Sequence, residues 1–317
     1  MNRKSGIVVS WWALALFLVI VALLAPVFMS GYALRFCTFV LMWIGLAGSL
    51  NLLTGYTGYL DFGHVAFFGT GSYVTGVLML KVGLPFFPAM FTGAVVAALI
   101  AYLVGIPTMR LKGAYFAIAM LAFAEAMKHV VLELDGITGG GNGLSLPIYT
   151  NYTFFYYTML AAVAFTIAIT YWFGRSKFGY ALKAIREDEL AADVSGVNTF
   201  SCKLIAFAIS AFVAGMIGGI YAYWMTFLTP DDSFNVLLTV RMIIMAFLGG
   251  AGTVLGPIIG ATFLASIEEI LWASFAYTYL IIVGIIVVIV VLYIPRGIVG
   301  LISEKLIKRY GKGRKSA

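Results

Sequence analysis

The stretch LIAFAISAFVAGMIGGIYAYWMTFLTP runs from Leu204 to Pro230 without a single Asp, Glu, Lys or Arg residue. A helix needs about 20 mostly apolar residues to cross the hydrocarbon core of a bilayer, so this stretch is long enough to span a membrane. Its apolar residues are continuous rather than alternating, which favours a helix over a barrel strand. Small residues at every fourth position let a neighbouring helix approach closely, and the stretch carries them at Ala211, Gly215 and Gly219.

Comparable uncharged runs recur along the 317-residue chain, of which 62% is apolar and only 10% is charged. The mean hydropathy is +1.03. Soluble domains contain about 25% charged residues, so this composition cannot cover a water-facing surface. It predicts an all-α, polytopic integral membrane protein with about ten membrane segments. The segments are expected at residues 10–29, 34–53, 60–80, 86–106, 113–133, 152–173, 204–226, 236–248, 256–271 and 274–294.

Two of these segments are short because glycines and a proline interrupt the uncharged run from Met242 to Ile267. Glycine and proline are the poorest helix formers, so the run is expected to form two short segments around a turn rather than one long helix. The residues at the expected break are Gly249, Gly250, Gly252, Gly256 and Pro257.

The basic residues are distributed unevenly around the segments. The chain has 20 Lys and Arg residues against 13 Asp and Glu, a formal net charge of +7, which in a soluble protein would suggest a nucleic-acid partner. Here most of them lie on one side of the ten-segment topology, above all in the loop over residues 174–203 and the basic tail over residues 303–317. Cytoplasmic loops are rich in Lys and Arg. We therefore expect both termini in the cytoplasm of a multi-pass inner-membrane protein, the tail along anionic lipid headgroups, and no nucleic acid.

The N-terminus also resembles a signal peptide, because Arg3 and Lys4 precede an apolar run. No clear small-x-small cleavage site follows, so the first segment is expected to be retained. No phosphate-binding loop of the G-x-x-x-x-G-K-[ST] type occurs, and His64 and His129 have no Cys or His at zinc-ligand spacing. These observations argue against an enzyme with its own cofactor or metal and for a channel, a transporter or a transporter subunit.

The cytoplasmic loop FGRSKFGYALKAIREDELAADVSGV, residues 173–197, is amphipathic. Its apolar residues recur at three- and four-residue steps, which predicts an apolar stripe on one helix. Such a helix could lie on lipid headgroups or dock into a groove on a partner protein. Three consecutive acids, Glu187, Asp188 and Glu189, disfavour an anionic lipid surface and favour the protein. The residues of the stripe are Ala181, Leu182, Ile185, Leu190, Ala191 and Val194.

Together with NLLTGYTGYLDFGHVAFFG over residues 51–69 and FLGGAGTVLGP over residues 247–257, this loop closely resembles the LivM-like permease subunits of branched-chain amino-acid ABC importers. The resemblance extends from about residue 30 to residue 302. It implies the ABC importer permease fold, as a single transmembrane domain over residues 1–317. It also implies a second, homologous permease subunit, two ABC ATPase subunits that use ATP and Mg, and an external substrate-binding protein.

Permeases of ABC importers carry an E-A-A-x-x-x-G pattern in the helix that couples them to the ATPase. Ala191, Ala192 and Gly196 match it here, but the leading position is Leu190, with Glu189 one place earlier. Which acid contacts the ATPase therefore stays open. The coupling residues that the resemblance implies are Arg186, Glu187, Asp188, Glu189, Ala191, Ala192 and Gly196.

Ionisable residues inside the hydrocarbon region cost about 2.5–3.5 kcal/mol each and usually face the interior of a bundle. Glu125, Lys128 and His129 fall within one expected segment. They line a path for a zwitterionic substrate or, as the blander and favoured interpretation, Glu125 and Lys128 form a structural pair at i, i+3. Asp61 and His64 begin the third segment, either as a helix cap or on a broken helix that lines a cavity.

Leucine, isoleucine and valine are the expected substrates on the resemblance alone, and the same family also serves urea and short-chain amides. An alternative is a self-sufficient secondary transporter driven by an ion gradient, with Asp61, Glu125 or His129 as proton carrier. A passive channel is a third reading, and it needs no energy source. Only the ABC reading requires a partner ATPase.

Overall fold

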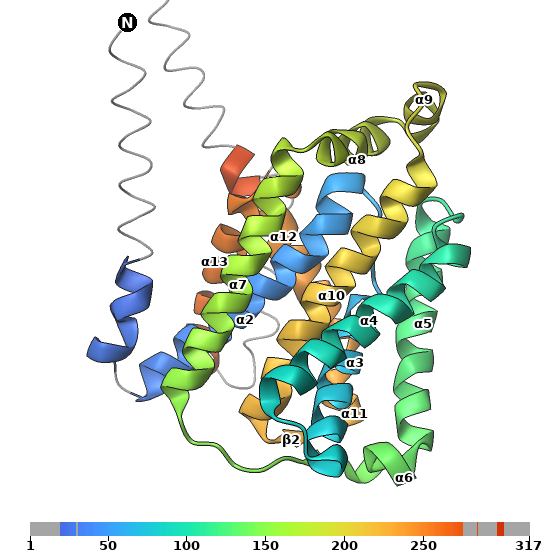
Figure 1. The fold of residues 1–317 in the computed structure, drawn as a ribbon. Helices are drawn as coiled ribbons and strands as arrows, with labels where there is room; N and C mark the ends of the chain where they lie inside the picture. The colour runs from blue at the N-terminus through green and yellow to red at the C-terminus, as the bar shows by residue number, and fades with distance from the viewer. Residues whose placement is uncertain (1–19, 30, 275–283, 285–296, 301–317) are drawn as a thin grey trace, which may run out of the picture.

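The computed structural model describes residues 20–29, 31–274, 284 and 297–300. It is mostly helical, and its long helices form one bundle (Figure 1). The long helices are α2 (Gly31–Leu50), α3 (His64–Val77), α4 (Phe86–Thr108), α5 (Ala114–Glu133), α7 (Tyr152–Arg175), α10 (Thr199–Met225), α12 (Val236–Gly249) and α13 (Leu255–Ser274). The shorter ones are η1 (Asn51–Gly55) and η2 (Leu78–Val82), which extend α2 and α3, and α6 (Asp135–Thr138), η3 (Gly140–Asn142), α8 (Lys177–Glu187), α9 (Glu189–Val194) and α11 (Pro230–Ser233).

Seven helices within the described residues are long and apolar enough to cross a membrane. The chain is therefore a polytopic helical membrane protein, and the finer count of about ten segments stays a prediction. Residues 10–19 of the expected segment 10–29, nearly all of the expected segment 274–294, and the whole basic tail over 303–317 fall outside the described residues.

The two ends of the bundle differ in what they carry. At one end, the upper end in Figure 1, α8 and α9 lie across the tips of the long helices. At the other end lie α6, α11 and a two-residue antiparallel pairing of β1 (Leu144–Ser145) with β2 (Phe227–Leu228), in which Leu144 faces Leu228. The loop between α7 and α10 is thus the one that shapes the first end.

Helix α10 packs against α2, α3 and α4 and is buried along most of its length. Contact between backbones makes this possible: a Cβ atom on Gly71 of α3 would collide with the backbone of Gly215 in α10. One on Gly218 would collide with the carbonyl of Phe68 in α3. Helices that approach this closely gain van der Waals contact that lipid cannot replace.

Helices α12 and α13 are separate, because α12 ends at Gly249 and α13 begins at Leu255. The turn between them uses Gly250 and Gly252 at φ 126° and 79°, values that residues with a side chain rarely adopt. Asn51 holds the turn in place: its Oδ1 accepts from Gly252 N at 2.7 Å and its Nδ2 donates to the Thr253 carbonyl at 3.1 Å. The broken segment is therefore fastened to the end of α2.

Candidate functional site

The loop over residues 174–203 contains two helices, so the prediction of one continuous helix is wrong. Asp188 separates α8 from α9 with an extended backbone, φ −158° and ψ 113°. Its Oδ1 accepts hydrogen bonds from Leu190 N and Ala191 N at 2.9 and 3.0 Å, which makes it the N-cap of α9. Asp188, one of the coupling residues that the resemblance implies, therefore has a structural role within the loop itself, as the N-cap of α9.

The break at Asp188 also divides the predicted apolar stripe. Leu182 and Ile185 on α8 are buried against the bundle, as the stripe predicts. On α9 the small side chain of Ala192 is buried, whereas Leu190 is 67% exposed and Val194 is 91% exposed. Because α9 starts anew after an extended residue, its register is not continuous with that of α8, and its large apolar side chains point away from the bundle.

Arg186 turns back towards the bundle. Its Nη1 donates to the Gly55 carbonyl of η1 at 2.6 Å and to the Ala251 carbonyl in the α12–α13 turn at 3.4 Å. Gly252 gives it room, since a Cβ there would lie 2.7 Å from the same Nη1 atom. Arg186 therefore connects α8 to the end of α2 and to the broken segment.

Glu189 also points inward. Its Oε1 accepts from Lys203 Nζ at 2.6 Å, and its Oε2 accepts from the Tyr59 hydroxyl at 2.5 Å. Burial raises the pKa of Glu189, but the hydrogen bonds from Lys203 and Tyr59 and the charges of Lys203 and Lys112 outweigh it, so the pKa lies below its usual range. Of the three consecutive acids, Glu189 is the one whose carboxylate bonds to side chains of the helix bundle.

The sequence interpretation missed Lys203 and Tyr59, counting Lys203 only as one of the basic residues of the loop. A signal was present: Lys203 directly precedes the uncharged run that begins at Leu204. A lysine at the start of a buried helix needs an acidic or carbonyl partner. Glu187, Ala191 and Gly196 are exposed in the described structure, and Gly196 has φ 86° beyond the end of α9.

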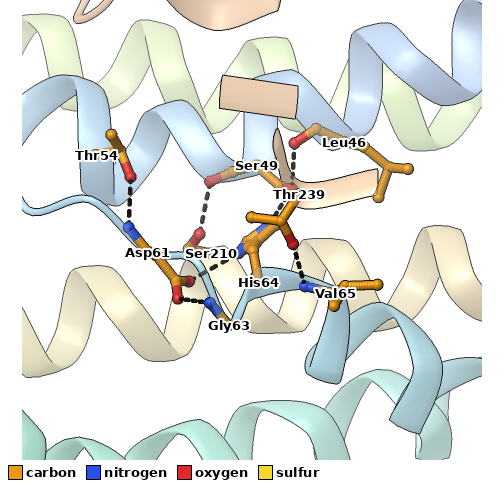
Figure 2. Close-up of polar contacts among 9 residues, drawn as sticks. All are labelled: Leu46, Ser49, Thr54, Asp61, Gly63, His64, Val65, Ser210 and Thr239. Carbon is orange, nitrogen blue, oxygen red and sulfur yellow. Dashed lines mark hydrogen bonds and ion pairs between the residues drawn. The ribbon is translucent and has the colours of Figure 1, made fainter. Parts of the chain in front are cut away.

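Asp61 and His64 belong to a buried polar cluster between α2 and α3 (Figure 2). Asp61 Oδ1 accepts from Gly63 N at 3.0 Å, and its Oδ2 lies 3.1 Å from His64 Nδ1. His64 Nε2 lies 2.8 Å from Ser49 Oγ. The Ser49 hydroxyl also lies within hydrogen-bond distance of the Leu46 carbonyl, at 2.7 Å. The N-cap of α3 is Gly63, so Asp61 braces the turn before the helix rather than capping it.

The same cluster reaches two further helices. Ser210 of α10 donates to the Ser49 carbonyl at 2.6 Å, and Val65 N donates to Thr239 Oγ1 of α12 at 3.0 Å (Figure 2). Both Asp61 and His64 are fully buried. Buried polar groups with complete hydrogen bonding hold helices in one arrangement, and that is the role this geometry supports.

Replacing Asp61 with asparagine removes the charge that faces His64 while keeping the size of the side chain. We expect the free energy of unfolding to fall by about 1.5–3 kcal/mol, the range for a hydrogen bond to a charged group. Thermal unfolding of the purified permease in detergent measures this. Asp193→Asn, at an exposed position on α9, is the matched control, and an equal, small shift in both variants would contradict the assignment.

Glu125, Lys128 and His129 lie on α5, which buries only Phe116, Met120, Ala124 and Val131. Lys128 Nζ lies 2.6 Å from Asp231 of α11 and 4.0 Å from Glu125 Oε1. His129 Nε2 lies 3.6 Å from that Glu125 oxygen. The expected Glu125–Lys128 pair is thus the looser of the two that Lys128 makes.

The side chains of Glu125 and His129 on α5 are largely exposed, at 52% and 67%. Asp61 and His64 are buried among other helices. The two groups of predicted path residues therefore do not share one surface in this chain. In the described residues, no cluster of His, Cys, Asp and Glu side chains could hold a metal ion.

Comparison with known proteins places these features in a family. The model of the branched-chain amino acid transport system permease component matches residues 28–291. LivM, the high-affinity branched-chain amino acid transport system permease protein of Escherichia coli strain K12, is 28% identical over 94% of this chain and 78% of its own length. LivM of Salmonella typhimurium is 27% identical over 94% of this chain and 77% of its own length.

LivH, also named a high-affinity branched-chain amino acid transport system permease protein, of Escherichia coli strain K12, is 27% identical over 83% of this chain and 91% of its own length. No solved structure matches. The matches cover nearly the whole bundle, including the α7–α10 loop and the α12–α13 turn. The chain therefore belongs to the family of permease components of branched-chain amino acid transport systems, and within it is LivM-like.

Proposed function

We propose that this chain is one of two different permease subunits of an ATP-driven importer of leucine, isoleucine and valine in the inner membrane. A LivH-like permease would complete the pore, two ABC ATPase subunits would hydrolyse ATP with Mg, and an external binding protein would deliver the substrate. Both LivM and LivH relatives are transport-system permeases. This likeness, together with the α8–α9 loop, supports the proposal.

The observation that carries the proposal is the geometry of α9. Leu190 and Val194 lie at i and i+4 on this short helix, so they share one face, and both are exposed. Arg186 and Glu189 fasten the helix pair to the bundle. A rigidly held apolar pair at the end of a membrane bundle suits a hydrophobic groove on a soluble partner. The end that carries α8 and α9 would then face the cytoplasm, as would both termini.

Helix α5 supports a place for this chain in a pore. A charged side chain facing lipid is costly, yet Glu125 and His129 are exposed in a helix long and apolar enough to span a membrane. The exposed face of α5 would therefore meet the second permease or the water-filled path between the subunits. A carboxylate there suits the ammonium group of an amino acid.

Reconstitution in proteoliposomes tests the energy source. The permease pair and binding protein are assembled with and without the ATPases, ATP is enclosed inside, and labelled leucine competes outside with valine or urea. We expect uptake only with ATPases and ATP, and competition by valine but not urea. Uptake without any ATPase would favour the secondary transporter or the channel, and competition by urea alone would favour the amide-carrying branch.

Replacing Glu125 with glutamine tests the path in the same proteoliposomes. Loss of a charge-assisted hydrogen bond to the substrate is expected to raise KM for leucine uptake about tenfold. Glu133→Gln, at an exposed position near the end of α5, is the control. An unchanged KM in the Glu125 variant would remove this residue from the path.

A further inference from the structure

Groups from four segments meet below α9. They are the Glu189 carboxylate, the Lys203 ammonium at the start of α10, the Tyr59 hydroxyl from the loop before α3, and the Met109 carbonyl that follows α4. The side chain of Lys203 is 3% exposed and that of Glu189 is 20% exposed. A charged pair that is this well shielded from water has strongly directional bonds.

Every donor of the ammonium group has a partner. Lys203 Nζ donates to Glu189 Oε1 at 2.6 Å, to the Tyr59 hydroxyl at 3.0 Å and to the Met109 carbonyl at 3.0 Å. An ammonium has three N–H donors, so none is left over. The Tyr59 hydroxyl accepts this bond and donates to Glu189 Oε2 at 2.5 Å. These hydrogen bonds therefore fix the position of the Lys203 ammonium relative to Glu189, Tyr59 and the Met109 carbonyl.

Helix α9 has few other attachments to the bundle. Of its six residues only Ala192 is buried, and Leu190 and Val194 point away. Apart from its chain connections to α8 and α10, α9 contacts the bundle through the side chains of Ala192 and Glu189. Glu189 bonds directly to α10 and to the loop before α3, and it is connected to the end of α4 through Lys203.

Arg186 reaches a different set of segments. It bonds to the carbonyls of Gly55 and Ala251, at the end of α2 and in the α12–α13 turn. The two connections are separated by the extended residue Asp188. The α8–α9 pair thus has two polar joints, one on each side of the break, which act on different helices.

We propose that Glu189, Lys203 and Tyr59 form the joint that transmits movement of α9 to α10, to α4 and to the loop before α3, and that they are positioning residues for ATP-driven transport. The proposal rests on the proposed function of α9 as the ATPase-docking helix. An apolar replacement of a buried ion pair often preserves stability. An apolar pair in place of Glu189 and Lys203 would lack the directional bonds that define the position of α9. Such a variant can therefore remain folded and yet fail to transmit movement of α9 to the bundle.

The test measures leucine uptake per ATP hydrolysed in proteoliposomes of the complete transporter. The double variant Glu189→Leu with Lys203→Met is expected to assemble with the ATPases and to hydrolyse ATP. Its ratio of uptake to hydrolysis is expected to fall about 2- to 30-fold, the effect of residues that carry coupling between sites. Tyr59→Phe keeps the ring and loses only the hydroxyl, so it tests the same joint with no risk to the packing, and a smaller fall is expected.

Lys177→Met is the matched control, because Lys177 lies on the same loop, is exposed, and belongs neither to this cluster nor to the coupling residues that the resemblance implies. An unchanged ratio in both the double variant and Tyr59→Phe would overturn the proposal, as would loss of ATPase association in Tyr59→Phe, since the cluster would then serve docking alone. Failure of the proposed function itself is distinguishable, because the unmodified transporter would then take up leucine without any ATPase.

Discussion

Gly71→Leu is expected to abolish accumulation of the folded permease. A Cβ atom at Gly71 would collide with the backbone of Gly215, and backbone atoms of a helix cannot turn aside as a flexible side chain can. The clash would separate α3 from α10, and a Cβ on Gly93 of α4 would already lie 2.8 Å from the Gly71 carbonyl. We expect a loss of at least about 3 kcal/mol, at the upper end of the usual cost of overpacking.

Size-exclusion chromatography and thermal unfolding in detergent measure this loss. Gly136→Leu is the matched control: Gly136 is exposed, and a Cβ there would have no heavy atom within 4 Å. The control should behave as the unmodified chain. A monodisperse Gly71→Leu protein with an unchanged unfolding midpoint would show that α3 and α10 do not pack backbone against backbone.

Leu190→Arg combined with Val194→Arg is expected to abolish ATPase association and transport while leaving the permease folded. Both side chains are exposed on α9, so charging them costs little stability. Buried apolar anchors at the centre of an interface commonly contribute 2 kcal/mol or more each to binding. Association with the ATPases should therefore weaken by at least about 30-fold, with transport falling in step.

Co-purification with the ATPases and uptake in proteoliposomes measure the two effects. Ile148→Arg is the matched control, because Ile148 is 82% exposed in the loop before α7, at the other end of the bundle. Retained association in the double variant would mean that the ATPases do not dock on α9. Arginine at Ala192 or Gly196 is a poorer test, since Ala192 is buried and Gly196 has φ 86°.

Much of the fold follows from local sequence. Uncharged runs such as Leu204 to Pro230 are sufficient for membrane-spanning helices, since in lipid a backbone must bond to itself. Ala211, Gly215 and Gly219 indicated where α10 packs closely, and Gly215 and Gly219 are in close contact with neighbouring helices. The glycine-rich stretch after Gly249 indicated a turn where α12 ends.

The loop between α7 and α10 was only half predictable. Periodicity found the buried face of α8, because that helix is continuous over several turns and Leu182 and Ile185 share one face. It failed beyond Asp188, since one extended residue resets the direction of every later side chain. The sequence does carry a local sign of this break, because Asp188 is a residue type that commonly caps a helix N-terminus. The spacing of the apolar residues alone does not reveal it.

By itself, then, the sequence determined that this is a polytopic helical membrane protein, because hydrophobic length acts within one segment at a time. Its motifs indicated the family. Only the tertiary structure decided which acid of the loop is held by the bundle. Glu189 pairs with Lys203 and with Tyr59, 14 and 130 residues away in the sequence. Such partners share no local period, and whether a charge is paired or exposed depends on which helices surround it.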